Sequence, residues 1–325
     1  MTQRRTFLGL VASAALLNGT QAMAQATFPT KPIRWVVGTA AGGGSDFVVR
    51  TVAHQLSQQL GQQIIVDNRP GGGTTIAADL VARSAADGYT LLTADTGTIV
   101  FNTALFKNLS YKPMKDLAPV GMLAHFPLLL VTHPNSGFSS AQAAIEAIRR
   151  SPGVHGYASA GVGSPHHIAM EFAKDQAKLD VRHVPYKGAA PAVQDLVGGV
   201  VPFGVIDSAA GLPMIRAGKL KALATFTKTR VAAFPDVPTL IELGYTLSEA
   251  PCWIAMVAPA GTPQDVIARL SAELAKALSH PDVQKKLRDF GLEPQPSSPA
   301  QLMTVWQQAD AYWPPLIRSK GITID

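Results

Sequence analysis

Three features are scarce in this sequence: cysteine, charged residues and long apolar runs. Of the 325 residues, one is cysteine (Cys252) and 15% are charged. A single cysteine excludes an internal disulfide, so the hydrophobic core must stabilise the fold by itself. After the N-terminal segment, no uninterrupted apolar run approaches the roughly 18 residues that a membrane-spanning helix needs. Together with an apolar content of 47%, these absences predict a globular chain that forms a core.

Basic residues are not concentrated anywhere either. The formal net charge is +6, but Lys and Arg are spread along the chain without a basic block. Nucleic-acid-binding proteins usually gather these residues on one face, with aromatic side chains among them. We therefore expect no nucleic-acid partner.

The N-terminal segment, residues 1–26, has the three-part layout of a secretory signal peptide. It begins with Arg4 and Arg5, continues with an apolar run over 7–17, and ends in alanines at alternating positions. The paired arginines, followed by Thr-Phe-Leu, resemble a twin-arginine export signal. We expect export and a mature protein located in the periplasm. A retained N-terminal helix or membrane anchor is the alternative.

Along the rest of the chain, short β-rich runs alternate with amphipathic helical segments. Residues 33–37 are predicted to form a buried strand, followed by a helix with Asp46 as a candidate N-cap and a second strand over 64–66. This β-α-β order predicts an α/β fold in which mainly parallel sheets carry helices on both faces. The length suits about two domains, and no long flexible linker occurs. We therefore expect two lobes, one of residues 27–131 plus 252–325 and one of residues 132–251.

The turn AAGGGSD, residues 40–46, follows the first predicted strand and offers backbone N–H groups to an anion. A dinucleotide-binding fingerprint fails because Phe47 occupies the third glycine position, although Asp67 lies near the expected acidic position. A P-loop fails because the turn has no lysine. We expect no nucleotide cofactor.

Two further chemical motifs also fail. The stretch YASAG around Ser159 lacks the first glycine of a nucleophile elbow, because Tyr157 stands there. His166, His167 and His183 have no accompanying cysteine, and adjacent histidines at a helix start point in different directions. The sequence therefore predicts neither a catalytic nucleophile nor a metal site.

What remains is a group of donor-rich loops at the ends of predicted strands. They contain Gly, Ser or Thr, which supply N–H and hydroxyl donors at little steric cost. In open α/β sheets such loops converge on the crevice beyond the carboxyl ends of the strands. A metal-free crevice of donors suits a small carboxylate. The loops comprise residues 40–46, 95–98, 159–164, 184–188 and 206–208.

Six segments of the chain resemble a known family. They are KPIRWVVGTAAGGGSD, VDNRPGGGTTIAADLVA, ADGYTLL, VPYKGAAPAVQDLVGG, FPDVPTLIELGY and APAGTP. In this order, and over nearly the whole mature chain, they resemble the Bug-type extracytoplasmic solute receptors, the binding proteins of tripartite tricarboxylate transporters. The resemblance implies a two-lobed, type II-like periplasmic binding fold. In such a fold the lobes close on a small ligand, most often an organic acid or an acidic amino acid.

The resemblance also implies a set of ligand-contacting residues. In the family, the first loop and the loop resembling SAGVGS supply donors to the ligand carboxylate, and other side chains line the cleft. Transferred to this sequence, these residues are Ala41, Gly42, Gly43 and Ser45 from the first lobe, Ser159, Gly163 and Ser164 from the second, and Thr96, Tyr186 and Asp207 along the cleft.

Several positions depart from the family pattern. In the first loop, Ala40, Gly44 and Ser45 stand where Pro and Pro-Thr are more usual. Asp95 stands where a small hydroxyl residue or glycine is more usual, His166 replaces a common Thr, and Ser208 replaces a common Asn. These residues are expected to influence which ligand is bound. His167 matches the family's histidine at a helix start, and we interpret it as a residue that braces the loop.

We therefore predict a non-enzymatic, monomeric receptor that captures a small carboxylate, needs no cofactor and delivers its ligand to a membrane permease. Two alternatives use the same cleft. One is a sensor that presents the ligand to a membrane kinase. The other is an exported enzyme that uses Asp95, His166 or Asp207 as a general base.

Overall fold

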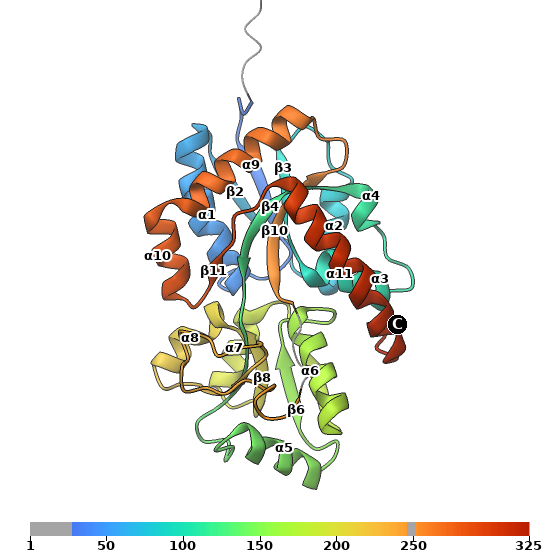
Figure 1. The fold of residues 1–325 in the computed structure, drawn as a ribbon, viewed down its shortest axis with the longest axis vertical. Coiled ribbons are helices and arrows are strands. Elements are labelled where there is room, and N and C mark those ends of the chain that lie inside the picture. The colour runs from blue at the N-terminus through green and yellow to red at the C-terminus, as the bar shows by residue number, and fades with distance from the viewer. Residues whose placement is uncertain (1–27, 246–250, 325) are drawn as a thin grey trace, which may run out of the picture.

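The computed structural model describes residues 28–245 and 251–324. The expected signal peptide lies outside the described residues. Two β-sheets, each with its own helices, are stacked along the long axis of the molecule (Figure 1). Within the described ranges, no helix is both long and apolar enough to cross a membrane.

The first lobe, as we name it here, contains a six-stranded sheet with the order β11-β4-β10-β3-β1-β2. Its strands are β1 (Ile33–Val37), β2 (Ile64–Asn68), β3 (Thr90–Asp95), β4 (Leu117–His125), β10 (Trp253–Pro259) and β11 (Glu293–Pro294). Its helices are α1 (Gly44–Leu60), α2 (Thr75–Ala82), α3 (Asn102–Leu105), α4 (Pro113–Asp116), α9 (Gln264–Ser279), α10 (Pro281–Asp289) and α11 (Pro299–Ser319), with short turns η1 (Gly72–Thr74) and η2 (Gly97–Phe101).

Strand β1 is buried on both faces, because its side chains alternate between two hydrophobic clusters. Ile33, Trp35 and Val37 pack in the cluster that contains α1 and α9. Val36 packs in the cluster that contains α2 and α11, where the Trp306 indole is fully buried. Helices therefore cover both faces of this sheet, as the alternating sequence pattern predicts.

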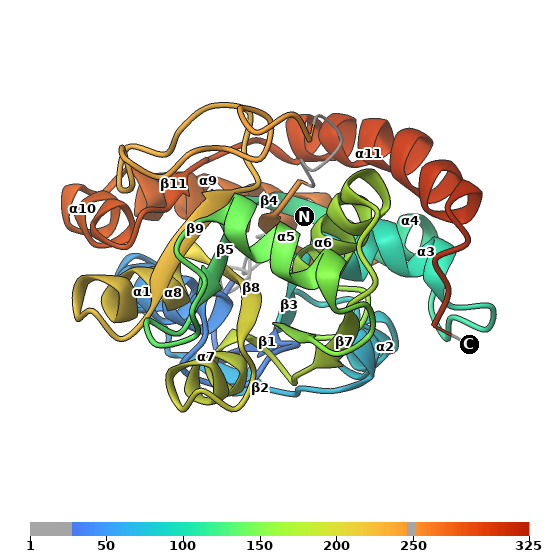
Figure 2. The same ribbon diagram turned by 90° about the horizontal axis from the view of Figure 1, so that it is seen from below.

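The second lobe contains a five-stranded sheet with the order β7-β6-β8-β5-β9. Figure 2 views it along the long axis, with α5 nearest the reader. Its strands are β5 (Leu128–Thr132), β6 (Gly156–Ser159), β7 (Arg182–Pro185), β8 (Phe203–Asp207) and β9 (Lys221–Thr225), and its helices are α5 (Ala141–Arg150), α6 (Pro165–Ala177), α7 (Ala189–Val197) and α8 (Ser208–Arg216).

The two-lobed α/β architecture is confirmed. Both sheets are mixed, however, whereas the sequence pattern predicted mainly parallel sheets. Strand β1 is parallel to β2 and β3, and β6 is parallel to β7 and β8. Strands β10 and β5 run antiparallel to their neighbours. The difference arises because the chain enters the second lobe at β5 and returns to the first lobe at β10. Both strands therefore begin at the cleft, where the parallel strands end, and run in the opposite direction.

The chain crosses into the second lobe between His125, the end of β4, and Leu128, the start of β5. Because β5 pairs with β8 and β9, this crossing lies a few residues before the predicted boundary after residue 131. The return crossing leads into β10 at Trp253, next to the predicted boundary before residue 252. That the two sheets move as separate lobes stays a prediction.

Candidate functional site

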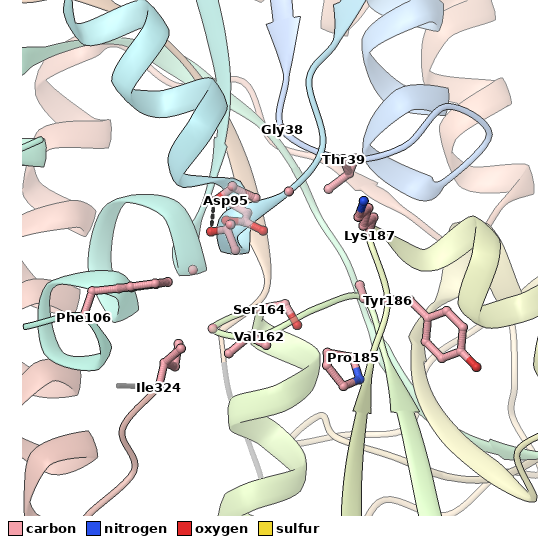
Figure 3. Close-up of a pocket in the computed structure, with 17 residues that line it drawn as sticks. Gly38, Thr39, Asp95, Phe106, Val162, Ser164, Pro185, Tyr186, Lys187 and Ile324 are labelled. Atoms are coloured by element: carbon pink, nitrogen blue, oxygen red, sulfur yellow. Dashed lines mark hydrogen bonds between the residues drawn. The ribbon is translucent and has the colours of Figure 1, made fainter. Parts of the chain in front are cut away.

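The parallel strands of both sheets end at one cleft between the lobes. Strands β1, β2 and β3 reach it from the first lobe, and β6 and β7 from the second. The segments that follow them enclose a cavity of about 270 Å³ (Figure 3). The first lobe contributes Gly38, Thr39, residues 71–74, Asp95, Gly97, Phe106 and Ile324, and the second lobe contributes Ala160, Val162, Gly163, Ser164, Pro185, Tyr186 and Lys187.

Glycines allow the two lobes to touch at the edge of this cavity. A Cβ atom on Gly97 would lie 2.7 Å from the carbonyl oxygen of Gly163, and one on Gly73 would lie 2.7 Å from the carbonyl oxygen of Val162. Both distances are shorter than van der Waals contact permits, so only glycine fits at these positions. The Ala40 N–H also donates to the Lys187 carbonyl at 2.9 Å. The structure is therefore closed around the cavity.

Opposite charges face the cavity from opposite lobes. Asp95 ends β3, and its Oδ1 accepts hydrogen bonds from the N–H of Thr98 at 2.7 Å and from the Thr98 hydroxyl at 2.6 Å. Lys187 follows β7, is exposed and lies beside Thr39 in Figure 3. The other lining side chains are uncharged, so the cavity combines one carboxylate and one ammonium with neutral backbone and hydroxyl groups.

The loop over residues 159–164 is braced by two stacked histidines. The Nδ1 atom of His167 accepts the Gly163 N–H at 3.2 Å, and the rings of His167 and His183 stack 4.1 Å apart. The Ser159 hydroxyl lies 2.6 Å from Nε2 of His183. Burial lowers the pKa of His167 to about 4. It also lowers the pKa of His183 to about 3, with a further contribution from His167. Neutral imidazoles therefore hold this loop, and His167 contacts it directly through the Gly163 N–H.

Ser164 and Gly163 line the cavity, but their polar groups are engaged within the loop. Ser164 N-caps α6 by accepting the His167 N–H, and its hydroxyl donates to the Gly161 carbonyl at 2.7 Å. The Gly163 N–H is taken by His167. The loop thus places the N-terminus of α6 at the cavity, and the positive end of that helix dipole favours an anion there.

The first glycine-rich turn, residues 40–46, bends away from the cavity. Asp46, which is 4% exposed, accepts the Gly42 N–H at 2.9 Å, Nε of Arg50 at 3.0 Å and Nδ2 of Asn68 at 3.0 Å. Burial alone would raise the pKa of Asp46, but these hydrogen bonds and the Arg50 charge lower it overall. The prediction that Asp46 caps α1 is wrong. The N-cap is Gly43, without a side-chain cap, because the Asp46 carboxylate folds the turn back instead.

Of the expected ligand-contacting residues, the cavity lining includes Gly163, Ser164 and Tyr186, and also the departure position Asp95. The Tyr186 hydroxyl points away from the cavity (Figure 3) and donates to Oδ2 of Asp195 at 2.6 Å. Burial and that carboxylate raise the pKa of Tyr186 to about 12. Its backbone, not its hydroxyl, is therefore what it offers to the site.

The expected residues of the first turn lie outside the main cavity. Ala41 and Gly42 are exposed, and Gly43 packs against the backbone of α7 in the second lobe. Ser45 borders a separate void of about 10 Å³ that shares Thr39 and Asp95 with the cavity. These positions are close to the site, but the lining begins nearer the strand, at Gly38.

The remaining expected residues are buried in contacts of their own. Ser159 is fully buried beside His183, and the Thr96 hydroxyl donates to the Pro251 carbonyl at 2.6 Å. Ser208 donates to the Gly291 carbonyl at 3.0 Å, across the lobes. Asp207 caps α8 by accepting the Ala210 N–H at 3.0 Å. A direct role of these side chains in ligand binding stays a prediction.

His166, at the start of α6, and Asp207, at the end of β8, form a buried pair. Nε2 of His166 lies 3.4 Å from Oδ2 of Asp207, yet neither ring nitrogen has a hydrogen bond with favourable geometry. Oδ1 of Asp207 approaches Gly44 so closely that a Cβ there would clash with it. Of the three groups proposed as a general base, only Asp95 lines the cavity. No cluster of three metal-ligating side chains occurs in the described part of the chain.

Several lining residues were not singled out from the sequence. The glycines of residues 71–73 follow β2, and all three have positive φ, at 123°, 58° and 60°. The run NRPGGG was an available signal for them. Lys187 belongs to the predicted donor-rich loop over residues 184–188, but nothing in the sequence marked this lysine as a lining residue. Phe106 and Ile324 arrive from the end of α3 and from beyond α11, and no local pattern predicts such long-range neighbours.

Two α/β lobes that close around a cavity at their strand ends define the class of two-lobed binding proteins. Among solved structures, a Rhodopseudomonas palustris protein, Rpa4515, with adipate superposes with a TM-score of 0.88 at 31% identity, covering 91% of this chain and 100% of that one. MatC from Rhodopseudomonas palustris, with bound malate, superposes with a TM-score of 0.85 at 32% identity, covering 89% of this chain and 100% of MatC.

The sequence comparisons agree with the structural ones. Protein BugT of Bordetella pertussis is 36% identical over 296 residues, which is 91% of each chain. The profile of the tripartite tricarboxylate transporter family receptors matches residues 48–322. The chain belongs to this receptor family, whose structural relatives include the periplasmic binding protein BugD.

Proposed function

We propose that this protein is a periplasmic receptor that captures a small carboxylate in the cavity between its lobes and delivers it to a membrane permease. The observation that carries the proposal is the cavity of about 270 Å³ at the carboxyl ends of five parallel strands. The N-terminus of α6 and the Lys187 ammonium both favour an anion there.

The donors available for this ligand come from both lobes. The Thr39 hydroxyl is buried and has no hydrogen-bond partner among the described residues, so it is free to donate. Glycines at 71–73 and 97 line the wall, so no side chain of their own stands between their backbone and a ligand. A ligand that contacts both walls would favour the closed arrangement, since its binding energy depends on the lobes being together.

Relatives support the same ligand class. The neighbours described above were solved with adipate and with malate, which are both small dicarboxylates. On this basis we propose a small organic acid or acidic amino acid as the ligand, with Ser164, Gly163, Asp95 and Tyr186 near it and with no covalent change to it.

A thermal-shift screen of the mature protein tests the proposal. Mono-, di- and tricarboxylates, aromatic acids and acidic amino acids are added one at a time. An acid present at about 100 times its Kd should stabilise the fold by roughly 2.7 kcal/mol and raise Tm accordingly. The proposal is wrong if no acid raises Tm. Recovery of the acid as a chemically altered product would favour the enzyme over the receptor.

A further inference from the structure

The charges on the cavity wall do not match a ligand that is only an anion. Among the lining residues, Asp95 is the one acid and Lys187 the one base, and they belong to opposite lobes. A simple carboxylate would complement Lys187 and the N-terminus of α6, but it would meet a like charge at Asp95. The cavity is too small to keep a ligand carboxylate far from that charge.

The Asp95 carboxylate is held through one of its two oxygens. Oδ1 accepts both the N–H and the hydroxyl of Thr98, and the Thr98 hydroxyl also lies 2.7 Å from that of Thr74. Oδ2 has no hydrogen-bond partner within residues 28–245 and 251–324. The contacts from Thr98 fix the orientation of the carboxylate and leave Oδ2 as a free acceptor on a residue that lines the cavity.

A free acceptor oxygen in a closed site discriminates between ligands. When the lobes close on a ligand that offers no donor to Oδ2, that oxygen loses its hydrogen bond to water and gains none from the ligand. A donor on the ligand instead forms a charge-assisted hydrogen bond with the carboxylate. Sites built to accept such a bond reject analogues that lack the donor more strongly than apolar pockets reject a missing methylene.

We propose that Asp95 is a specificity residue whose Oδ2 accepts a hydrogen bond from a hydroxyl or ammonium group that the bound carboxylate also carries. The inference rests on the proposed function, since it chooses among carboxylates. It predicts that amino acids bind most tightly, hydroxy acids next and unsubstituted acids least. An ammonium supplies both a donor and an opposite charge, whereas a hydroxyl supplies the donor alone.

Two matched ligand series test the inference. One consists of aspartate, malate and succinate, and the other of glutamate, 2-hydroxyglutarate and glutarate. Within a series the carbon chain and both carboxylates stay constant, while carbon 2 carries an ammonium, a hydroxyl or a hydrogen. Kd is measured by calorimetry near neutral pH. In at least one series, the substituted acids should bind wild-type protein at least about tenfold more tightly than the unsubstituted acid.

The variant Asp95→Asn keeps the shape of the side chain and an oxygen for Thr98, but it replaces the free acceptor with an NH₂ donor. We expect the preference for substituted acids to fall about fivefold or more, and the unsubstituted acid to bind more tightly than in wild type. Lys187→Met is the matched control on the opposite wall. It should weaken all members of a series by a similar factor and leave their order unchanged.

The outcomes separate this inference from the proposed function. If the unsubstituted acids bind as tightly as the substituted ones in both series, the role of Asp95 is refuted and the receptor function stands. An unchanged preference in folded Asp95→Asn protein would refute it as well. If no acid of either series or of the thermal-shift screen binds, the proposed function itself fails. Should Asp95→Asn not fold, the wild-type preference still decides.

Discussion

Two glycine-rich loops follow neighbouring parallel strands of the first lobe, and they lie differently with respect to the cavity. The first glycine loop, residues 40–46, comes after β1, and the second glycine loop, residues 71–74, comes after β2. The second lines the cavity along its whole length, whereas none of the first does. Glycine content after a strand therefore indicates an open turn without indicating where the turn faces.

Side-chain hydrogen bonds explain the difference. Asp46 draws the first glycine loop back onto α1 through the Gly42 N–H, and Asn68 at the end of β2 holds the same carboxylate. The second glycine loop has three successive positive φ values and passes directly into α2. Asn102, at the start of α3, donates to the Gly73 carbonyl at 2.9 Å and holds this loop at the sheet edge.

The largest effect that separates the two loops is expected from Gly73→Ala and Gly42→Ala. Both glycines have positive φ, at 60° and 83°, so each alanine should cost a similar amount of stability, about 1 kcal/mol. A Cβ on Gly73 would lie 2.7 Å from the Val162 carbonyl, whereas one on Gly42 has its nearest neighbour at 3.8 Å. Forcing the lobes apart should cost about 1–3 kcal/mol of binding, measured as a Kd roughly 5- to 150-fold weaker for Gly73→Ala alone.

A second pair of glycines serves as the control without backbone strain. Neither Gly97 nor Gly43 has a positive φ. A Cβ on Gly97 would meet the Gly163 carbonyl at 2.7 Å, while one on Gly43 would make ordinary contacts at 3.6 Å or more. Gly97→Ala should therefore weaken binding and Gly43→Ala should not. Equal affinities for all four variants would show that the closed contacts do not matter for binding.

A smaller effect is expected from pH, and it distinguishes the histidine-braced loop from the first glycine loop. His167 and His183 have pKa values lowered by burial to about 4 and about 3, against about 6.5 in the unfolded chain. Below pH 6.5 the unfolded state binds protons that the folded state does not, so stability is complete above pH 6.5 and falls toward pH 4. Because the pKa of Asp46 is lowered, its contribution to folding stability is lost only at more acidic pH, below about 4.

Denaturant unfolding at pH 7 and pH 5 measures this dependence. Wild-type protein should lose on the order of 2–4 kcal/mol between the two values. His125, whose pKa is also lowered by burial, adds in the same direction. His183→Gln, which cannot be protonated, should show a clearly weaker dependence. Equal stability of wild-type protein at both pH values would mean that these imidazoles are not neutral in the fold.

Much of the fold could be predicted from sequence because its signals are local. The strand over 33–37 follows from its apolar run, and helix α1 follows from its apolar periodicity; the helix ends at Leu60, and Gly61 is its C-cap. The antiparallel strands β5 and β10 could not be predicted in this way, because their direction depends on which lobe the chain comes from. Local hydrophobic patterns carry no information about that order of connection.

The candidate site was predicted less completely than the fold. Position at a strand end was enough to place Asp95 and residues 163–164 at the cleft. It did not reveal that the Gly163 N–H donates to His167 and the Ser164 hydroxyl to the Gly161 carbonyl. Nor did it reveal that the Tyr186 hydroxyl donates to Asp195. These hydrogen bonds are local in sequence, but they depend on how the backbone turns in each loop, which hydrophobic periodicity does not specify.

The most direct test of the account is a crystal structure of the protein grown with the acid that gives the largest thermal shift. The account predicts the ligand in the cavity of about 270 Å³, with its carboxylate between the second glycine loop and the N-terminus of α6. A ligand held instead by residues 40–46, or bound outside the space between the lobes, would contradict it.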